Sequence, residues 1–539
     1  MKFPELLLTL LNGDNQDDIA QIFCNQLMLD YQIVEYSEEP SKDTTSDYCF
    51  FSPSTKIKEK LLNSLSRKIC FKIFPVLLNI DEEKNKIQRV HSYIRYNKLI
   101  KQIKKYKKAI ELNNTRSSKL KISKKIYEPR NFCTLKNNKE LSFNVLNPLP
   151  MPVEVAPLED LEPFFEFLKS SQPITDEQIE FKRGIFYNDG RMDLCKQVVA
   201  DKHIEKLMDS IKNNMYIKHF LLGNNIISLE GATAIANYLK EYPYTIETWY
   251  LAGNRIDASG IKLICKELSS STVTKSLWLK RNPLFDEGAY YISLMLNHNK
   301  SIEVLDLHNT GIGDKGAKFI FESLKHNNTL RHLYLGACGL EEITYIIEYF
   351  DFLVHNKIHG LEHIYLDMNR LGNYWADRLV NVVNKYEFMK GFTISSNRLT
   401  DCSYILDTLA ENKSIINLDL GFYKATLDMG ELPNNFGIED REKNILAISN
   451  FLFTNDTVKV FSIMNTGLTA EDIDKISCYL HNNESIIMFN YEQYNEKSYP
   501  RTLKTINDII KRNSKGENIR ELKHGNLIRF IDSNYRNNM

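Results

Sequence analysis

Apolar residues in the second half of the chain follow two periods that alternate. Within 217–227, the apolar residues Phe220 and Leu222 of the recurring pattern stand two positions apart, which predicts a short strand with one buried face. Leu239 follows Asn225 by 14 residues, at a spacing that predicts the inner face of a following helix. The same succession then recurs along the chain. Each unit is therefore expected to consist of a strand, a turn and a helix.

The polar position after each strand sets the length of the repeat. Its successive occupants are Gln197, Asn225, Asn254, Asn282, Thr310 and Cys338. They are 28, 29, 28, 28 and 28 residues apart. An Asn side chain at this point can bond to backbone groups as the chain turns inward, and Thr or Cys can replace it. Because one unit cannot bury its own apolar face, neighbouring units must stack into a solenoid.

One unit carries this pattern in its fullest form. Residues 217–232 read I-x-x-F-x-L-x-x-N-x-I and then Gly-Ala, which resembles the ribonuclease-inhibitor-like class of leucine-rich repeats. The resemblance covers about 185–495 and implies an α/β solenoid with parallel strands on a concave face and helices on a convex face. We expect about nine or ten repeats with all strands parallel. An insert at roughly 424–445, after Tyr423, leaves the register of the last repeats open.

Charge is distributed unevenly although the chain has 69 basic and 69 acidic side chains. Residues 14–48 and 154–180 are acidic, whereas residues 84–125 are basic. The stretch 148–173 contains six prolines, which predicts an extended linker rather than a continuous helix. The expected divisions are an α-rich N-terminal domain at 1–147, a Pro-rich acidic linker at 148–184, the solenoid at 185–495 and a helical C-terminal cap or tail at 496–539.

Alternate strand residues are expected to line the concave face. At the central position of the strands, four of the first six repeats carry Tyr or Trp in this interpretation, and such side chains are enriched in binding hot spots. The alternative is that these aromatic residues only stabilise adjacent strands. The candidate partner-binding residues are Tyr250, Trp278, Asp306, His308, His332, Tyr334, His363 and Tyr365. The N-terminal domain is one candidate for the partner that covers them.

Catalytic and metal chemistry find little support in the repeats. His332 and His363 are expected roughly 5 Å apart on adjacent strands, but no third metal ligand is evident. Asp306 and His308 could form an acid–base pair, but no nucleophile accompanies them. The solenoid class also includes Ran GTPase-activating proteins, in which an arginine near the repeats assists GTP hydrolysis, and Arg191 is the candidate here. That motif does not map residue by residue, so we expect no enzyme activity and no cofactor.

A second class of partner is suggested by the basic segment 84–125, which predicts a long basic helix. Its lysines and interleaved tyrosines could contact phosphates of nucleic acid or of an anionic membrane surface. The alternative is a solvated face neutralised by the acidic stretches of the same chain. The lysines concerned are Lys101, Lys104, Lys105, Lys107 and Lys108.

The nine cysteines are scattered, with no C-x-x-C pair, which favours reduced thiols in a reducing compartment such as the cytoplasm. The repeat class occurs in cytosolic regulators, immune receptors and secreted bacterial effectors, so delivery as an effector stays open.

We expect a non-enzymatic scaffold that binds a protein on the concave face. The alternatives are a GTPase-activating or other enzyme-regulating protein and a binder of nucleic acid or anionic surfaces.

Overall fold

The computed structural model describes most of the repeat region and the C-terminal part of the chain. It describes 154–422, 432–492, 500–514 and 516–537, and as backbone only 132–136 and 139–143. The last two ranges form an antiparallel hairpin of β1 (Phe132–Lys136) and β2 (Lys139–Phe143). The basic segment 84–125 with its lysines and the acidic stretch 14–48 lie outside the described residues.

In the described residues, thirteen strands form one open sheet whose strands are neighbours in sequence order. Eleven of these strands, β5 to β15, pair in parallel. The strands are β3 (Gln178–Glu180), β4 (Ile185–Tyr187), β5 (Arg191–Asp193), β6 (His219–Leu221), β7 (Thr248–Tyr250), β8 (Ser276–Trp278), β9 (Val304–Asp306), β10 (His332–Tyr334), β11 (His363–Tyr365), β12 (Gly391–Thr393), β13 (Asn417–Asp419), β14 (Val460–Ser462) and β15 (Met488–Asn490).

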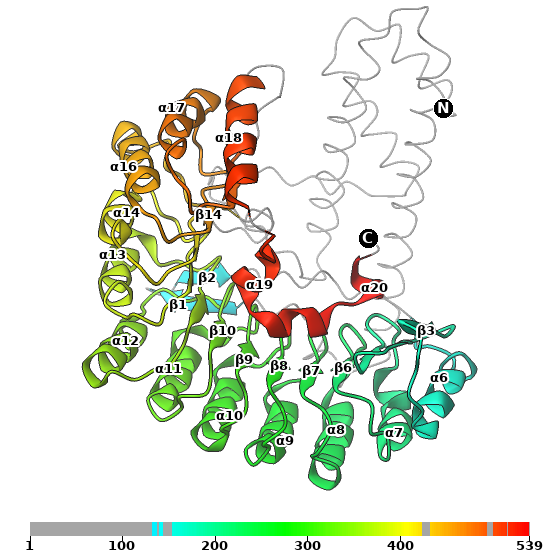
Figure 1. Ribbon diagram of the computed structural model, residues 1–539. Coiled ribbons are helices and arrows are strands. Elements are labelled where there is room, and N and C mark those ends of the chain that lie inside the picture. Colours follow the sequence, from blue (N-terminus) through cyan, green and yellow to red (C-terminus); the bar gives the residue numbers. More distant parts are fainter. Residues whose placement is uncertain are drawn as a thin grey trace, which may run out of the picture. The chain divides into compact units, whose positions relative to one another are not determined.

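The helices form an outer layer over one face of this sheet, so the predicted α/β solenoid is confirmed (Figure 1). They are α6 (Leu158–Ser170), α7 (Ala200–Ile211), α8 (Leu229–Glu241), α9 (Ala258–Leu268), α10 (Phe285–His298), α11 (Gly313–Leu324), α12 (Thr344–Asn356), α13 (Gly372–Val383), α14 (Ser403–Leu409), α16 (Arg441–Thr454), α17 (Ala470–Leu480) and α18 (Pro500–Asn513). The main core lies between the two layers and includes Leu222, Leu251, Leu279 and Leu307, all fully buried.

The expectation that all strands are parallel is wrong at the start of the solenoid. β3 pairs antiparallel with β4, and β4 pairs antiparallel with β5. The chain reverses between β4 and β5 at a tight turn in which Gly190 has φ +85°. A Cβ atom there would lie 2.6 Å from the carbonyl oxygen of Tyr216, so the turn requires glycine. The antiparallel strands cap the open edge of the first parallel strand.

The interpretation of the proline-rich stretch as an extended linker is wrong for α6, which contains Pro163. The ring of Pro163 removes one backbone hydrogen bond, which costs stability inside a helix. The helix forms because four large apolar side chains of one face are buried at the end of the main core, and each contributes about 1.5–3 kcal/mol. These side chains are Leu161, Phe164, Phe165 and Leu168.

The turn asparagines bond to backbone groups as expected. Asn254 donates from its side-chain amide to the carbonyl oxygens of Leu222 and Leu251, each at 2.9 Å. Its Oδ1 accepts from the backbone N–H groups of Asn225 at 2.9 Å and Ile227 at 3.2 Å. Each such amide therefore connects two consecutive turns and fixes the stacking distance of the repeats.

The register beyond Tyr423 is now defined. Asn434, within the predicted insert, takes the turn position of the next repeat, because its Oδ1 accepts from the N–H groups of Asn397 at 2.7 Å and Leu399 at 3.0 Å. An eleventh parallel strand, β15, extends the nine or ten expected repeats. The sequence signal for β15 is the spacing of Ile486, Phe489 and Tyr491, which are buried.

Candidate protein-interaction surface

The strand register places the predicted aromatic residues in one row across the sheet. Tyr250 pairs with Trp278 on β7 and β8, and Tyr334 pairs with Tyr365 on β10 and β11. The rings of Tyr334 and Tyr365 are stacked, with centroids 3.9 Å apart. The rings of Trp278 and Tyr334 lie 5.5 Å apart, on either side of the strand that carries Asp306. Sequence periodicity therefore identified one continuous row of side chains.

This row is covered by the end of the same chain, which we call the C-terminal segment and define as residues 516–537. It contains α19 (Ile519–His524), the 3₁₀ helix η1 (Asn526–Ile531) and α20 (Asn534–Asn537). Figure 1 shows these elements, in red, running along the face of the sheet opposite the helices. Tyr250 is 5% exposed and Trp278 and Tyr365 are 3% exposed. The sequence did not reveal that this segment covers them.

Apolar side chains of η1 hold the segment against β6 and β7. A 3₁₀ helix has three residues per turn, so Ile528 and Ile531 lie on the same face. Both are buried, in a cluster that also contains Tyr250 and Trp278. The ring of Phe530 stacks on His219 with centroids 3.9 Å apart.

Polar contacts fix the last residues of the segment at the start of the sheet. Arg536 donates to the hydroxyl of Tyr250 and lies over its ring, 4.3 Å from the centroid. The Ser533 hydroxyl donates to Asp193 at 3.0 Å. Arg191 donates to the carbonyl oxygen of Asp532 at 2.9 Å.

The predicted candidate Arg191 is thus part of the attachment of the C-terminal segment. Its guanidinium also forms an ion pair with Asp189 at 2.8 Å and lies over the ring of Tyr187 at 4.1 Å. A transition-state arginine must reach into the site of a bound nucleotide. In this structure the guanidinium is directed to groups of its own chain instead.

The junction between α19 and η1 contacts the centre of the aromatic row. His524 Nδ1 lies 3.2 Å from the hydroxyl of Tyr334, and the Tyr365 hydroxyl donates to the carbonyl oxygen of Lys523 at 2.5 Å. Gly525 has φ +75°, and a Cβ atom there would lie 2.7 Å from the ring of His332. Only glycine therefore allows the backbone to pass this close to the sheet.

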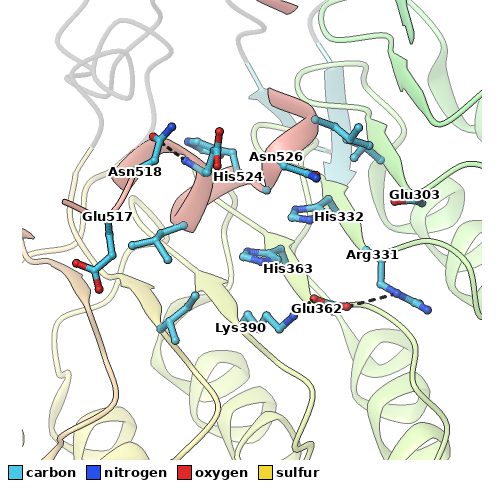
Figure 2. Close-up of a pocket in the computed structure, with 16 residues that line it drawn as sticks. Glu303, Arg331, His332, Glu362, His363, Lys390, Glu517, Asn518, His524 and Asn526 are labelled. Atoms are coloured by element: carbon cyan, nitrogen blue, oxygen red, sulfur yellow. Dashed lines mark hydrogen bonds and ion pairs between the residues drawn. The ribbon is translucent and has the colours of Figure 1, made fainter. Parts of the chain in front are cut away.

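A cavity of about 470 Å³ lies between α19 and the sheet. Figure 2 shows His332 and His363 on its floor, on adjacent strands, with charged side chains around them. Glu362 forms ion pairs with Arg331 at 3.4 Å and with Lys390. The labelled lining residues are Glu303, Arg331, His332, Glu362, His363, Lys390, Glu517, Asn518, His524 and Asn526.

The two floor histidines stack on each other, with ring centroids 4.2 Å apart. Among the described residues, neither Nδ1 atom has a hydrogen-bond partner. Burial lowers the pKa of His332 to about 4 and places the pKa of His363 well below its usual value. No group of three or more metal-ligating side chains occurs in the described ranges.

The contact found between Asp306 and His308 is not a bond between their side chains, as an acid–base pair requires. Asp306 instead accepts a hydrogen bond from the backbone N–H of His308 at 2.8 Å. Burial raises the pKa of the Asp306 carboxyl to about 6, although Lys280 opposes the shift. Burial also lowers the pKa of Lys280. These charged groups lie under the covered part of the face and contribute polarity to it.

Histidine titration offers a test of this arrangement. We expect the ring proton signals of His219, His332 and His524 in NMR spectra to stay unchanged between pH 8 and 5. Burial lowers their pKa values to about 3, 4 and 3 respectively, so the rings remain neutral while covered. An exposed histidine titrates near pH 6.5. A shift of these signals centred near that pH would contradict the covered geometry.

The sign of the resulting pH dependence follows from linkage. Above about pH 6.5 these histidines are neutral whether the face is covered or uncovered, so they do not oppose coverage. As the pH falls toward 4, protonation favours the uncovered state and coverage becomes less stable. The carboxyls of Asp306 and Asp367, whose pKa values burial raises to about 6, act in the opposite sense. Protonation of these carboxyls relieves the cost of burying them. The two effects partly cancel, so acid alone is not expected to uncover the face sharply.

Comparison with known proteins agrees with the repeat architecture. A family model described as "Leucine Rich repeat" matches residues 298–321, which include β9 and most of α11. The fold is a leucine-rich-repeat solenoid. No helix of the described residues is long and apolar enough to cross a membrane.

Three similar proteins extend this comparison. The chain is 29% identical over 92 residues to FERM domain-containing protein C of Dictyostelium discoideum, a match that covers 17% of this chain and only 6% of that protein. The structure titled "Leiomodin-1 Actin-Binding Site 2" has a TM-score of 0.26 at 17% identity, covering 31% of this chain and 88% of that one. An internalin (inlF) of Listeria monocytogenes has a TM-score of 0.34 at 15% identity, covering 68% and 99%.

Proposed function

We propose that this leucine-rich-repeat chain is a non-enzymatic scaffold that binds a protein partner on its concave face. The observation that carries the proposal is that this face already holds a stretch of polypeptide, the C-terminal segment. The segment is bound through aromatic stacking, apolar burial and hydrogen bonds together. These are the contact types of protein interfaces.

The proposed binding residues form the row of aromatic side chains on the concave face and occupy the strand positions next to that row. Tyr250 and Trp278 supply rigid contact area, and Tyr334 and Tyr365 add hydroxyl groups that bond to polypeptide. His332 and His363 flank them, and Asp306 and His308 provide polar contacts. Strand–helix units of 28 or 29 residues support assignment to the ribonuclease-inhibitor-like subtype. Free cysteines in the described ranges support placement in a reducing compartment such as the cytoplasm.

The test is affinity purification from the native cells with two baits, the wild-type chain and a Trp278→Ala/Tyr334→Ala variant. We expect a partner that the wild type retains and the variant does not. A matched Tyr374→Ala variant, in which an exposed residue of α13 is truncated, should retain the partner. A partner retained equally by all three baits would place binding elsewhere on the chain.

The basic segment leads to a separate expectation. The full-length chain should bind nucleic acid no better than a charge-matched control protein at ~0.15 M salt, because the chain carries no net charge overall. A filter-binding or anisotropy titration at two salt concentrations measures this. Sub-micromolar binding that weakens steeply with salt would assign the lysines of 84–125 to phosphate contacts instead.

A further inference from the structure

We propose that the C-terminal segment is an autoinhibitory, displaceable ligand of the concave face, and that the partner is a peptide segment of the same chemistry. This inference rests on the proposed function, because the displacing partner uses the same face. The occupancy by the chain's own segment can be tested without that partner.

The first argument is that the solenoid core is complete without the segment. The main core between strands and helices extends from Ala156 to Ile509 and contains no residue of 516–537. The apolar residues of the segment belong to a second cluster, on the other face of the sheet. No residue of helix α19 is fully buried, and His524 is partly covered. Detaching the segment therefore breaks the contacts of one face and leaves the repeats intact.

The second argument is that the segment is held unevenly. Helix η1 packs directly on β6 and β7, whereas α19 contacts β14 and spans a cavity of about 470 Å³. This space is open to solvent, so α19 leaves part of the face beneath it uncovered. The unfilled part under α19 is where a competing peptide can first reach the sheet.

The third argument concerns the chemistry that the face selects. Ile528 and Ile531 bring two aliphatic side chains to the aromatic row, and Phe530 adds a ring that stacks on His219. Basic groups accompany them. Arg536 is near the buried carboxyl of Asp193, and Lys523 is near that of Asp419. The partner segment is thus expected to be apolar and basic, with a short helical turn that presents two aliphatic residues three positions apart.

The consequence for regulation follows from population arithmetic. While the segment is seated, a partner can bind only the fraction of molecules in which the face is open. If that fraction is ~10% or less, as for typical minor states, the apparent affinity falls at least ~10-fold. Any event that weakens the segment's hold then increases partner binding without a change in the face itself.

The experiment uses the full-length chain and a fluorescent synthetic peptide with the sequence of residues 516–537. The loosened variant carries Ile528→Ser and Ile531→Ser, which remove the two aliphatic contacts. A matched control carries Leu432→Ser and Ile438→Ser, two aliphatic residues that are 61% and 73% exposed. Fluorescence anisotropy should show the loosened variant binding the peptide at least ~10-fold more tightly than the wild type or the control. A peptide with the same two serines should not bind.

Two results would overturn the proposal: equal peptide affinity of the wild type and the loosened variant, or binding by neither. Because the variant could fail to fold, hydrogen exchange on the wild type provides an independent measurement. Amides of residues 519–536 should exchange at least ~100-fold faster than those of β6 to β9, because local opening costs less than unfolding. Equal protection would make the segment an integral part of the fold. A partner that binds away from the concave face would refute the proposed function and leave these results unaffected.

Discussion

Replacing Leu279 by alanine is expected to lower the free energy of unfolding by about 2–5 kcal/mol. Leu279 is fully buried in the main core between strands and helices. Its truncation removes apolar contacts and leaves a cavity that the stacked neighbours cannot fill without moving. Leu307, at the equivalent position of the next repeat, should behave in the same way. Urea unfolding followed by circular dichroism measures both.

Leu294→Ala provides the control, because this leucine of α10 is 43% exposed. Its truncation should change stability by no more than ~0.5 kcal/mol, as for most surface substitutions. Repeats contact mainly their neighbours, so the core variants should also broaden the transition as the array divides at the damaged unit. Unfolding midpoints of the Leu279 and Leu307 variants that match the wild type would contradict the register of the solenoid.

The sequence alone was sufficient for the architecture of the repeats, for a physical reason. Each repeat packs against its neighbours in the same way, so its apolar residues and its turn asparagine recur at a fixed spacing that can be recognised in the sequence. Asn254 illustrates this, since one side chain satisfies backbone groups on two turns. The alternation of strand residues also placed Tyr250, Trp278, Tyr334 and Tyr365 in one row, as their strand register shows.

The ends of the solenoid escaped prediction because they do not repeat. The first strands pair antiparallel because two tight turns, one at Gly184 and one at Gly190, reverse the chain twice. Helix α6 tolerates Pro163 because its apolar face covers an otherwise open end of the core. A second series of asparagines, at the ends of the helices, was also missed. Asn299, for example, donates to the carbonyl oxygens of Leu268 at 2.7 Å and Ser271 at 3.1 Å.

The occupant of the concave face could not be found by periodicity at all. The contact between Arg536 and Tyr250 joins residues 286 positions apart, and a 22-residue segment offers no period to detect. In retrospect the apolar group of Leu527, Ile528, Phe530 and Ile531 in a basic surrounding was the available signal. It marks a short segment that needs an apolar surface to cover it. The sequence did not indicate which surface of the chain covers this segment.

Partner binding by the Trp278→Ala/Tyr334→Ala variant is expected to weaken by about 2–4 kcal/mol, if the two side chains act as hot spots. Both lie on the concave face, outside the main core. The repeats should therefore fold with a circular dichroism spectrum like that of the wild type. In the full chain, the measured loss of partner-binding free energy should nevertheless be smaller than the energy of the contacts that these two side chains make with the partner. The same truncation also loosens the C-terminal segment, which makes the face easier to open.

A double-mutant cycle separates these two effects. Partner affinity is measured by calorimetry for the wild type, the aromatic double variant, the loosened Ile528→Ser/Ile531→Ser variant and the combination of both. In the loosened background no segment competes, so the loss on truncating Trp278 and Tyr334 should reach its full value. The difference between the two backgrounds then measures how strongly the segment uses the same two side chains. Equal losses of partner affinity in both backgrounds would mean that the partner and the segment do not share these residues. Unfolding of the aromatic variant would show instead that the two rings are needed for the fold.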